Sequence, residues 1–411
     1  MEEKQKKLNG YGLGVVTGIL VTLLVACGVW TGKRIYDGGR TSEVSVTGLI
    51  KEDSVINSET LSKMAAIERT VDEHFYFDTV TEEDMQAGIC RGMVEALNDK
   101  YAVYYTAEEL STQLQDNEGV YYGIGARVMM DMEKEMPYIS GVISDTPAEE
   151  AGLQMGDIIY AVDGTTTFQM TLEEVTGMIK GEEGTSVTLT LVRDGVSFDQ
   201  DVVRRKVTNP TVTSEMLEDK IGYIAISEFK DTTVDQFTEA YAVLKGSDAR
   251  ALILDLRGNP GGLLDAVVSI GQQLLPEGLV VYTEDKDGER IEYKCDGTRQ
   301  IKIPMVVLVN GGSASASEVL TGAIKDYGVG TVMGTTTYGK GIVQKIIQLS
   351  DGSGIKLTTS AYFTPKGNNI HGTGIEPDVV VEFDAEAYYG EENIDNQLEA
   401  AKEYLENKLH G

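Results

Sequence analysis

The most constraining stretch of this chain predicts a strand, a tight turn and a helix in direct succession. An apolar run at Met305–Val309 predicts a buried strand, and Asn310-Gly-Gly follows it as a turn. The segment Ser313–Glu318 (SASASE) then opens a helix, because apolar side chains recur at helical spacing until Gly328, a typical helix stop. Small hydroxyl residues therefore gather at the start of this helix.

A serine at the start of a helix can act as a nucleophile if a base accompanies it. Free backbone N–H groups and the positive end of the helix dipole favour a developing oxyanion there. None of the three histidines, His74, His371 and His410, lies in a setting that suggests a serine–histidine pair. Lys340, which is flanked by glycines, is a candidate base, since burial disfavours the ammonium form and lowers the pKa of a lysine.

Three motifs together resemble the carboxyl-terminal-processing (tail-specific) serine peptidases. They are Ser313–Glu318 (SASASE), Tyr338–Gln344 (YGKGIVQ) and Leu254–Leu263 (LDLRGNPGGL). The resemblance implies that Ser315 is the nucleophile, that Lys340 is its base and that Gln344 orients the lysine. It covers nearly all of the chain after about residue 61, and it implies no cofactor. A Ser315–His371 pair is the rival interpretation.

The spacing of the lysine and the glutamine sets a geometric condition. On an extended strand, Lys340 and Gln344 would point the same way but lie about 13 Å apart. One helical turn would bring their side chains within about 6 Å. We therefore expect a turn between Lys340 and Gln344.

A glycine pair after another predicted strand supplies candidate donors for an oxyanion. Gly261 and Gly262 follow the strand predicted at Ala251–Leu256 and open a helix. We assign one N–H donor to Gly262 and the other to Ala316, the residue after Ser315, and Gly261 stays an open alternative. The pair could also form a simple turn that needs positive φ.

Residues 111–194 resemble a bacterial PDZ domain. The run Pro147–Gly164 (PAEEAGLQMGDIIYAVDG) carries this resemblance. PDZ domains bind an extended C-terminal peptide as an added strand and hold its carboxylate on backbone N–H groups. The resemblance places that carboxylate at Gly123, Ile124 and Gly125. The alternative for these three residues is the plain start of a strand.

Alternating strands and helices across residues 214–383 predict an α/β peptidase core with a mainly parallel sheet. The resemblance implies a crotonase/Clp-protease-like fold with the β-rich PDZ domain inserted into its sequence. We expect a connector at 195–213 and packed helices without chemistry at 59–110. Residues 384–411 predict a charged helical tail, which either docks on the core or forms a dimer contact.

The start of the chain predicts a single transmembrane helix. Residues 11–30 carry no charge and would span about 30 Å as a helix, enough to cross a bilayer. Residues 1–10 then form a cytoplasmic tail and 31–58 a polar linker, with everything beyond outside the cytoplasmic membrane. Alternatively, Cys27 in the run LVAC is the acylated residue of a lipoprotein, which places the catalytic part on the same side.

The charge and the cysteines of the chain limit the classes of ligand and cross-link that we expect. The chain has 35 basic and 66 acidic residues and a net charge of −31, which argues against nucleic-acid binding. Cys90 and Cys295 could pair, and no residue spacing suggests a metal site. The partners we expect are proteins or peptides with free C-termini, and a homodimer is possible.

An inactive relative that only displays a PDZ domain would lack Ser315, Lys340 or Gln344, and all three are present.

Overall fold

The structure is a computed structural model that describes residues 54–77, 80–132, 134–390 and 393–410. It divides into two compact units, Met1–Asp84 and Met85–Gly411. The predicted anchor at 11–30 and Cys27 lie outside the described residues. Within the described ranges, no helix has both the length and the apolar character that crossing a bilayer requires. Cys90 and Cys295 are both free thiols, so the pairing considered for them is absent.

The segment expected to be helical, residues 59–110, contains helices and one strand. The helices are α3 (Ser58–His74), α4 (Glu82–Glu95) and the start of α5 (Ala107–Glu118). Asn57 caps α3 by accepting the N–H groups of Glu59 and Thr60. The strand is β1 (Val103–Tyr105), whose β-branched and aromatic residues favour extended backbone.

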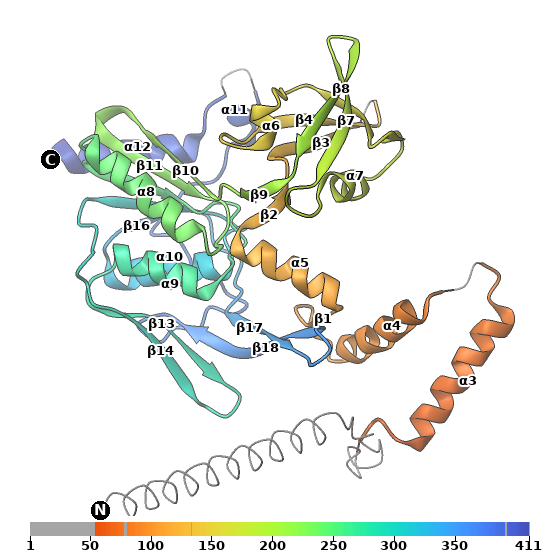
Figure 1. The fold of residues 1–411 in the computed structure, drawn as a ribbon. Helices are drawn as coiled ribbons and strands as arrows, with labels where there is room; N and C mark the ends of the chain where they lie inside the picture. Colours follow the sequence, from red (N-terminus) through yellow and green to blue (C-terminus); the bar gives the residue numbers. More distant parts are fainter. Residues whose placement is uncertain (1–53, 78–79, 133, 391–392, 411) are drawn as a thin grey trace, which may run out of the picture. The chain divides into compact units, whose positions relative to one another are not determined.

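The core is built on a six-stranded sheet with the order β10-β11-β12-β15-β16-β19. Figure 1 labels three of these strands, β10, β11 and β16. Its strands are β10 (Val212–Met216), β11 (Ile221–Ile226), β12 (Ala251–Asp255), β15 (Met305–Val309), β16 (Thr331–Gly334) and β19 (Val379–Val380). The pairs from β11 to β19 are parallel and β10 is antiparallel. The predicted α/β core with a mainly parallel sheet is therefore confirmed, whereas the crotonase/Clp likeness stays a prediction.

Helices cover both faces of this sheet because side chains alternate along its buried strands. Leu252, Leu254 and Val307 belong to one apolar cluster with α8 (Thr233–Gly246), α9 (Leu264–Leu274) and α10 (Ala316–Tyr327). Ile253, Val306 and Leu308 point the other way and pack with Ala401 and Leu405 of α12 (Asn396–His410). The charged tail therefore docks on the core. Short α11 (Ala385–Tyr389) precedes it.

A second sheet brings distant parts of the chain together beside the core. Its order is β1-β18-β13-β14, and β17 also pairs with β18. Its later strands are β13 (Gly278–Asp285), β14 (Arg290–Cys295), β17 (Ile342–Gln348) and β18 (Gly354–Phe363). Because β1 precedes the PDZ region and pairs with β18, the PDZ region lies inside the sequence of the core.

The PDZ region forms a sheet with the order β3-β4-β5-β7-β8, in which β3 is an edge strand. Its strands are β3 (Ala126–Asp131), β4 (Met136–Val142), β5 (Ile158–Val162), β6 (Thr165–Thr166), β7 (Ser186–Arg193) and β8 (Val196–Val203). Two helices join them, α6 (Pro147–Glu150) and α7 (Leu172–Ile179). A separate ribbon pairs β2 (Val120–Gly123) with β9 (Arg205–Thr208).

The connector expected at 195–213 is wrong, because most of it is strand. β8 pairs with β7 along its whole length, from Arg193↔Val196 to Ser186↔Val203. Two aspartates make this strand hard to predict from the sequence, because aspartate is uncommon in strands. Asp199 and Asp201 accept hydrogen bonds from threonine hydroxyls of β7 at 2.7 and 2.6 Å, which satisfies the acidic side chains on the outer face.

Candidate active site

Ser315 sits between the end of β15 and the first residue of α10. Its φ of 53° and ψ of −114° are unusual for a residue other than glycine, so the backbone is strained where the nucleophile is expected. The turn before it is held by Ser313. The Ser313 hydroxyl accepts the N–H of Asn310 at 2.9 Å and donates to the carbonyl of Leu256 at 2.7 Å.

The buried carboxylate of Glu318 joins the serine segment to the lysine segment. One of its oxygens accepts the backbone N–H groups of Ser315 and Lys340, each at 2.8 Å. The other accepts the N–H of Gly339 at 2.7 Å and the hydroxyl of Thr337 at 2.6 Å. Glu318 is fully buried, and four donors compensate its loss of water. The motif Ser313–Glu318 gives Glu318 no role by itself, although an acidic side chain on an otherwise apolar helix face is a usable signal.

Tyr362 fixes the same two residues from their carbonyl side. Its hydroxyl lies 3.0 Å from the carbonyl oxygen of Ser315 and 2.5 Å from that of Lys340. Burial, helped by the charge of Glu318, raises the pKa of Tyr362 well above its ordinary value, so the hydroxyl keeps its proton. Two buried side chains thus set the separation of the Ser315 and Lys340 backbones.

One cavity of about 340 Å³ brings the predicted catalytic residues together. Ser315, Ala316, Lys340, Gln344 and Gly262 all line it. His371 is exposed and is not among its lining residues, so the rival Ser315–His371 pair gains no support. The catalytic roles of the lining residues stay predictions.

The surroundings of Lys340 favour its neutral, basic form, but its amine is not hydrogen-bonded to Ser315. Burial lowers the pKa of Lys340, and the nearby positive charge of Lys356 lowers it further. Its Nζ lies 4.3 Å from the centre of the Tyr101 ring. No hydrogen bond joins this Nζ to the Oγ of Ser315. The structure therefore holds the amine against an aromatic face beside the nucleophile.

The turn expected between Lys340 and Gln344 is wrong. Gln344 lies on β17, which begins at Ile342 and is bulged between Val343 and Gln344. Pairing with β18 prevails here over a local turn. The Gln344 amide donates to the Oγ1 of Thr358 at 3.2 Å rather than to Lys340. Thr358 in turn donates to Asp99, and this hydrogen bond lowers the pKa of the Asp99 carboxyl, assisted by the charge of Lys340.

The geometry of the glycine pair favours Gly262 over Gly261 as an oxyanion donor. The N–H of Gly261 is already bonded to the Oδ1 of Asn259 at 2.8 Å. The N–H groups of Gly262 and Ala316 have no acceptor among the described residues. Gly262 has a φ of 138°, and a Cβ there would collide with the carbonyl of Phe229, so only glycine fits.

A larger cavity of about 1010 Å³ lies at the predicted carboxylate site. Gly123 and Ile124 line it together with residues of β3, α5 and α7, whereas Gly125 lies beside it. Gly125 has a φ of 87°, and a Cβ there would collide with Thr146. The ring of Tyr121 lies against Gly123, and the N–H of Gly125 donates to the Tyr121 hydroxyl. The roles of the three predicted binding residues also stay predictions.

Comparisons with known proteins agree with this organisation. The model of peptidase family S41 matches residues 220–381, and the PDZ domain model matches residues 138–193. The "Probable CtpA-like serine protease" of Staphylococcus saprophyticus is 34% identical over 371 residues, 90% of this chain and 72% of that protein. This chain belongs to peptidase family S41. It is a serine protease of the carboxyl-terminal-processing type with a PDZ domain.

Two further comparisons agree with this assignment, one in sequence and one in fold alone. The carboxyl-terminal-processing protease of Synechocystis is 35% identical over 296 residues, 71% of this chain and 69% of that protein. A solved structure from Bacteroides fragilis, provisionally assigned to the S41 proteases, shares the fold at 18% identity and a TM-score of 0.51. That likeness covers 77% of this chain and 90% of the other. This second likeness therefore concerns the fold of the chain alone.

Proposed function

We propose that this S41 protease recognises substrates by their free C-terminus and cleaves them with a Ser315–Lys340 mechanism. The observation that supports the mechanism best is the shared cavity. Ser315, Lys340 and both candidate oxyanion donors line it, and burial has lowered the pKa of Lys340. A lysine that gives up its proton more easily can act as a general base near neutral pH.

In this mechanism the Oγ of Ser315 attacks the scissile carbonyl carbon while neutral Lys340 accepts the hydroxyl proton. The N–H groups of Gly262 and Ala316 stabilise the tetrahedral oxyanion at the start of α10. Protonated Lys340 then donates to the leaving amine, and water hydrolyses the acyl-enzyme. Lys340 must first leave the Tyr101 ring. The amide oxygen of Gln344 can then accept a hydrogen bond from the amine while the amide nitrogen keeps its bond to Thr358.

The helix α5 supports delivery of a bound C-terminus to this cavity. Gln113 and Asn117 of α5 line the catalytic cavity, whereas Thr112 and Asp116 of the same helix line the PDZ cavity. A peptide that adds to the free edge of β3 would place its carboxylate near Ile124, as in other PDZ complexes. Its upstream residues then need only pass around one helix to reach Ser315.

The proposal also places the enzyme at a membrane. Residues 11–30 would anchor the chain as a single-pass helix, with the protease outside the cytoplasmic membrane, or an acyl chain on Cys27 would do so. The uncharged length of this segment and the basic residues before it support the proposal. A homodimer stays a prediction.

The catalytic proposal can be tested with the full chain in detergent and unfolded casein as substrate. Ser315→Ala and Lys340→Met should each abolish cleavage while the thermal unfolding curve is kept. Lys366→Met, which removes an exposed lysine, is the matched control and should cleave normally. Full cleavage by either active-site variant would refute the Ser315–Lys340 assignment.

The recognition proposal needs its own measurement. A peptide with a free C-terminus should have a kcat/KM at least about tenfold above that of its C-terminal amide, because the amide lacks the charge that the backbone N–H groups bind. Equal values for the two peptides would contradict C-terminal recognition and leave the Ser315–Lys340 mechanism intact.

A further inference from the structure

We propose that Asp395 and Gln397, at the start of α12, are positioning residues that hold the oxyanion loop, residues 258–262, through Arg257. The inference rests on the proposed function, because that function assigns Gly262 of this loop as an oxyanion donor. The C-terminal helix would then belong to the catalytic apparatus and not only to the fold.

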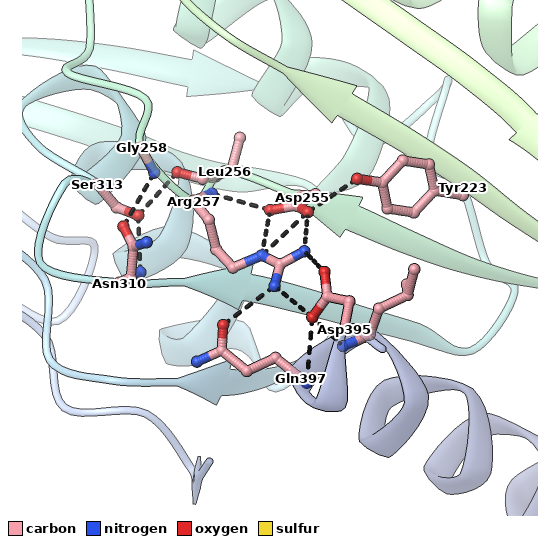
Figure 2. Close-up of polar contacts among 10 residues, drawn as sticks. Tyr223, Asp255, Leu256, Arg257, Gly258, Asn310, Ser313, Asp395 and Gln397 are labelled. Carbon is pink, nitrogen blue, oxygen red and sulfur yellow. Dashed lines mark hydrogen bonds and ion pairs between the residues drawn. The ribbon is translucent and has the colours of Figure 1, made fainter. Parts of the chain in front are cut away.

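Arg257 uses every N–H group of its guanidinium on three side chains (Figure 2). Nε donates to the Oδ1 of Asp255 at 3.0 Å. Nη1 donates to Asp395 at 2.9 Å and to Gln397 at 3.0 Å. Nη2 donates to Asp255 at 2.6 Å and to Asp395 at 2.7 Å. A guanidinium has five N–H donors in a rigid plane, so its direction is fixed from two sides.

The partners of Arg257 are themselves held in place (Figure 2). Asp255, at the end of β12, accepts the hydroxyl of Tyr223 at 2.8 Å and the backbone N–H of Arg257 at 2.9 Å. Asp395 caps α12 by accepting the N–H of Gln397 at 3.2 Å and that of Leu398 at 3.0 Å. Burial alone would raise the pKa of the Asp395 carboxyl. The hydrogen bond and charge of Arg257, together with the N–H groups of Leu398 and Gln397, outweigh burial and lower this pKa overall.

Gln397 adds a second link from α12 to the same arginine. Its side chain is 1% exposed, and its amide nitrogen donates to the carbonyl of Val381 at 2.7 Å. This bond turns the amide oxygen toward the Nη1 of Arg257. Both polar atoms of the Gln397 side chain are therefore hydrogen-bonded, the nitrogen to Val381 and the oxygen to Arg257.

The oxyanion loop follows Arg257 directly and takes its conformation partly from contacts outside itself. Three of its five residues are glycines with positive φ, Gly258, Gly261 and Gly262. The far end of the loop is anchored at Phe229, whose N–H donates to the carbonyl of Gly261 at 2.8 Å. The near end is anchored by Arg257. A shift of Arg257 would therefore move the loop that carries the Gly262 N–H.

The loop also reaches the nucleophile. The carbonyl of Asn259 accepts the N–H of Ala314 at 2.9 Å and the hydroxyl of Ser317 at 3.0 Å, on either side of Ser315. The N–H of Gly258 donates to the Oδ1 of Asn310 at 2.9 Å. Displacement of the loop would therefore disturb both the oxyanion donor and the turn that presents the serine.

Docking of α12 does not by itself explain this polar cluster. Ala401 and Leu405 are already fully buried against the sheet. The loss of Asp395 would leave two guanidinium N–H groups of a 13% exposed side chain without their partner. A buried guanidinium with unpaired N–H groups is costly, so the Arg257 side chain would turn toward water. This movement would displace the oxyanion loop that follows it.

The test compares the full chain with Asp395→Asn and Gln397→Met, and Glu403→Gln is the control. Glu403 is an exposed acid on the same helix, so its variant matches the lost charge without touching Arg257. For cleavage of a peptide with a free C-terminus, kcat should fall about 10–100-fold in Asp395→Asn, with KM within about twofold, since small misplacements of catalytic groups have effects of this size. Gln397→Met should show a smaller loss of the same kind.

A second readout separates positioning from folding. A small alkyl fluorophosphonate reacts with Ser315 without using the PDZ domain, and its rate should fall in parallel with kcat in both variants. Unchanged kcat and labelling rates would overturn the inference. Normal labelling of the folded fraction, with activity lost only through unfolding, would overturn it too. If the wild-type chain is labelled but cleaves no such peptide, the proposed function fails, and the labelling rates still decide the inference.

Discussion

The backbone N–H of Lys340 lies 2.8 Å from the Oε2 of Glu318, the same oxygen that accepts the N–H of Ser315. A single buried atom therefore sets how far apart the proposed nucleophile and base begin. Tyr362 contacts the carbonyl groups of the same two residues. The pair is placed by its backbone, while the Lys340 amine lies against the ring of Tyr101.

Glu318→Gln should disrupt this arrangement. A glutamine would present an NH₂ group to donors that need an acceptor, and it would leave at least one of them unpaired in the interior. We expect the free energy of unfolding to fall by about 1–3 kcal/mol and kcat/KM to fall about 100-fold. Urea unfolding and peptide hydrolysis measure the two effects. Glu239→Gln, an exposed change on α8, should alter neither, and an active, stable Glu318→Gln variant would show that the carboxylate is dispensable.

The acid limb of the pH–rate profile should report Lys340. Its pKa lies below the ordinary 10.5, so the neutral amine accumulates, and kcat/KM rises, at a lower pH than for an exposed lysine. Lys356→Met removes a positive charge that lowers this pKa. The limb should therefore move to higher pH and leave several-fold less activity at pH 7. Lys345→Met is the control on β17. A limb that moved to lower pH would contradict the assignment.

Tyr101→Leu should ease the release of the Lys340 amine. The ring stabilises the resting ammonium by a cation–π contact worth about 0.5–1 kcal/mol, so its loss should raise kcat/KM near pH 7 about two- to fivefold. Tyr101→Phe keeps the aromatic face and should behave as the wild type. Initial rates at fixed pH test this. Equal rates in the leucine and phenylalanine variants would mean that the ring does not restrain the amine.

Tyr121→Phe should tighten C-terminal peptide binding. The Tyr121 hydroxyl accepts the N–H of Gly125, one of the groups proposed to hold the substrate carboxylate. A ligand must displace this bond, and removing it should lower Kd about 2- to 10-fold, the equivalent of one neutral hydrogen bond. Titration of Ser315→Ala protein with a labelled peptide measures Kd. Tyr160→Phe is the control elsewhere in the PDZ region, and a weaker complex for Tyr121→Phe would mean that the hydroxyl assists binding.

Periodicity predicted the core well because its strands are continuous apolar runs between turns. The predicted strands at residues 251–256 and 305–309 match β12, to within one residue, and β15. The predicted helix stop, Gly328, is the left-handed C-cap of α10. Strands that owe their stability to distant partners were missed. β1 has only three residues and depends on β18, and the aspartates of β8 depend on threonines of β7.

At the site, local motifs predicted which residues lie close together but not which hydrogen bonds they make. Ser315 and Lys340 share a cavity, as their motifs indicated. The Gln344–Thr358 bond depends on strand pairing, which spacing cannot show. The sequence shows Arg257 only as part of a motif, because its partner Asp395 lies 138 residues further along the chain. The contacts that were missed join segments far apart in the sequence.

The pairing of Tyr105 with Gly354 has a consequence for biosynthesis. It closes a span of 249 residues (354 − 105), so the sheet that carries Gln344 can form only after the whole PDZ region has left the ribosome. At ordinary translation rates this interval is about 12–50 s. The PDZ region can thus fold first, and the peptidase core is completed only when synthesis is almost over.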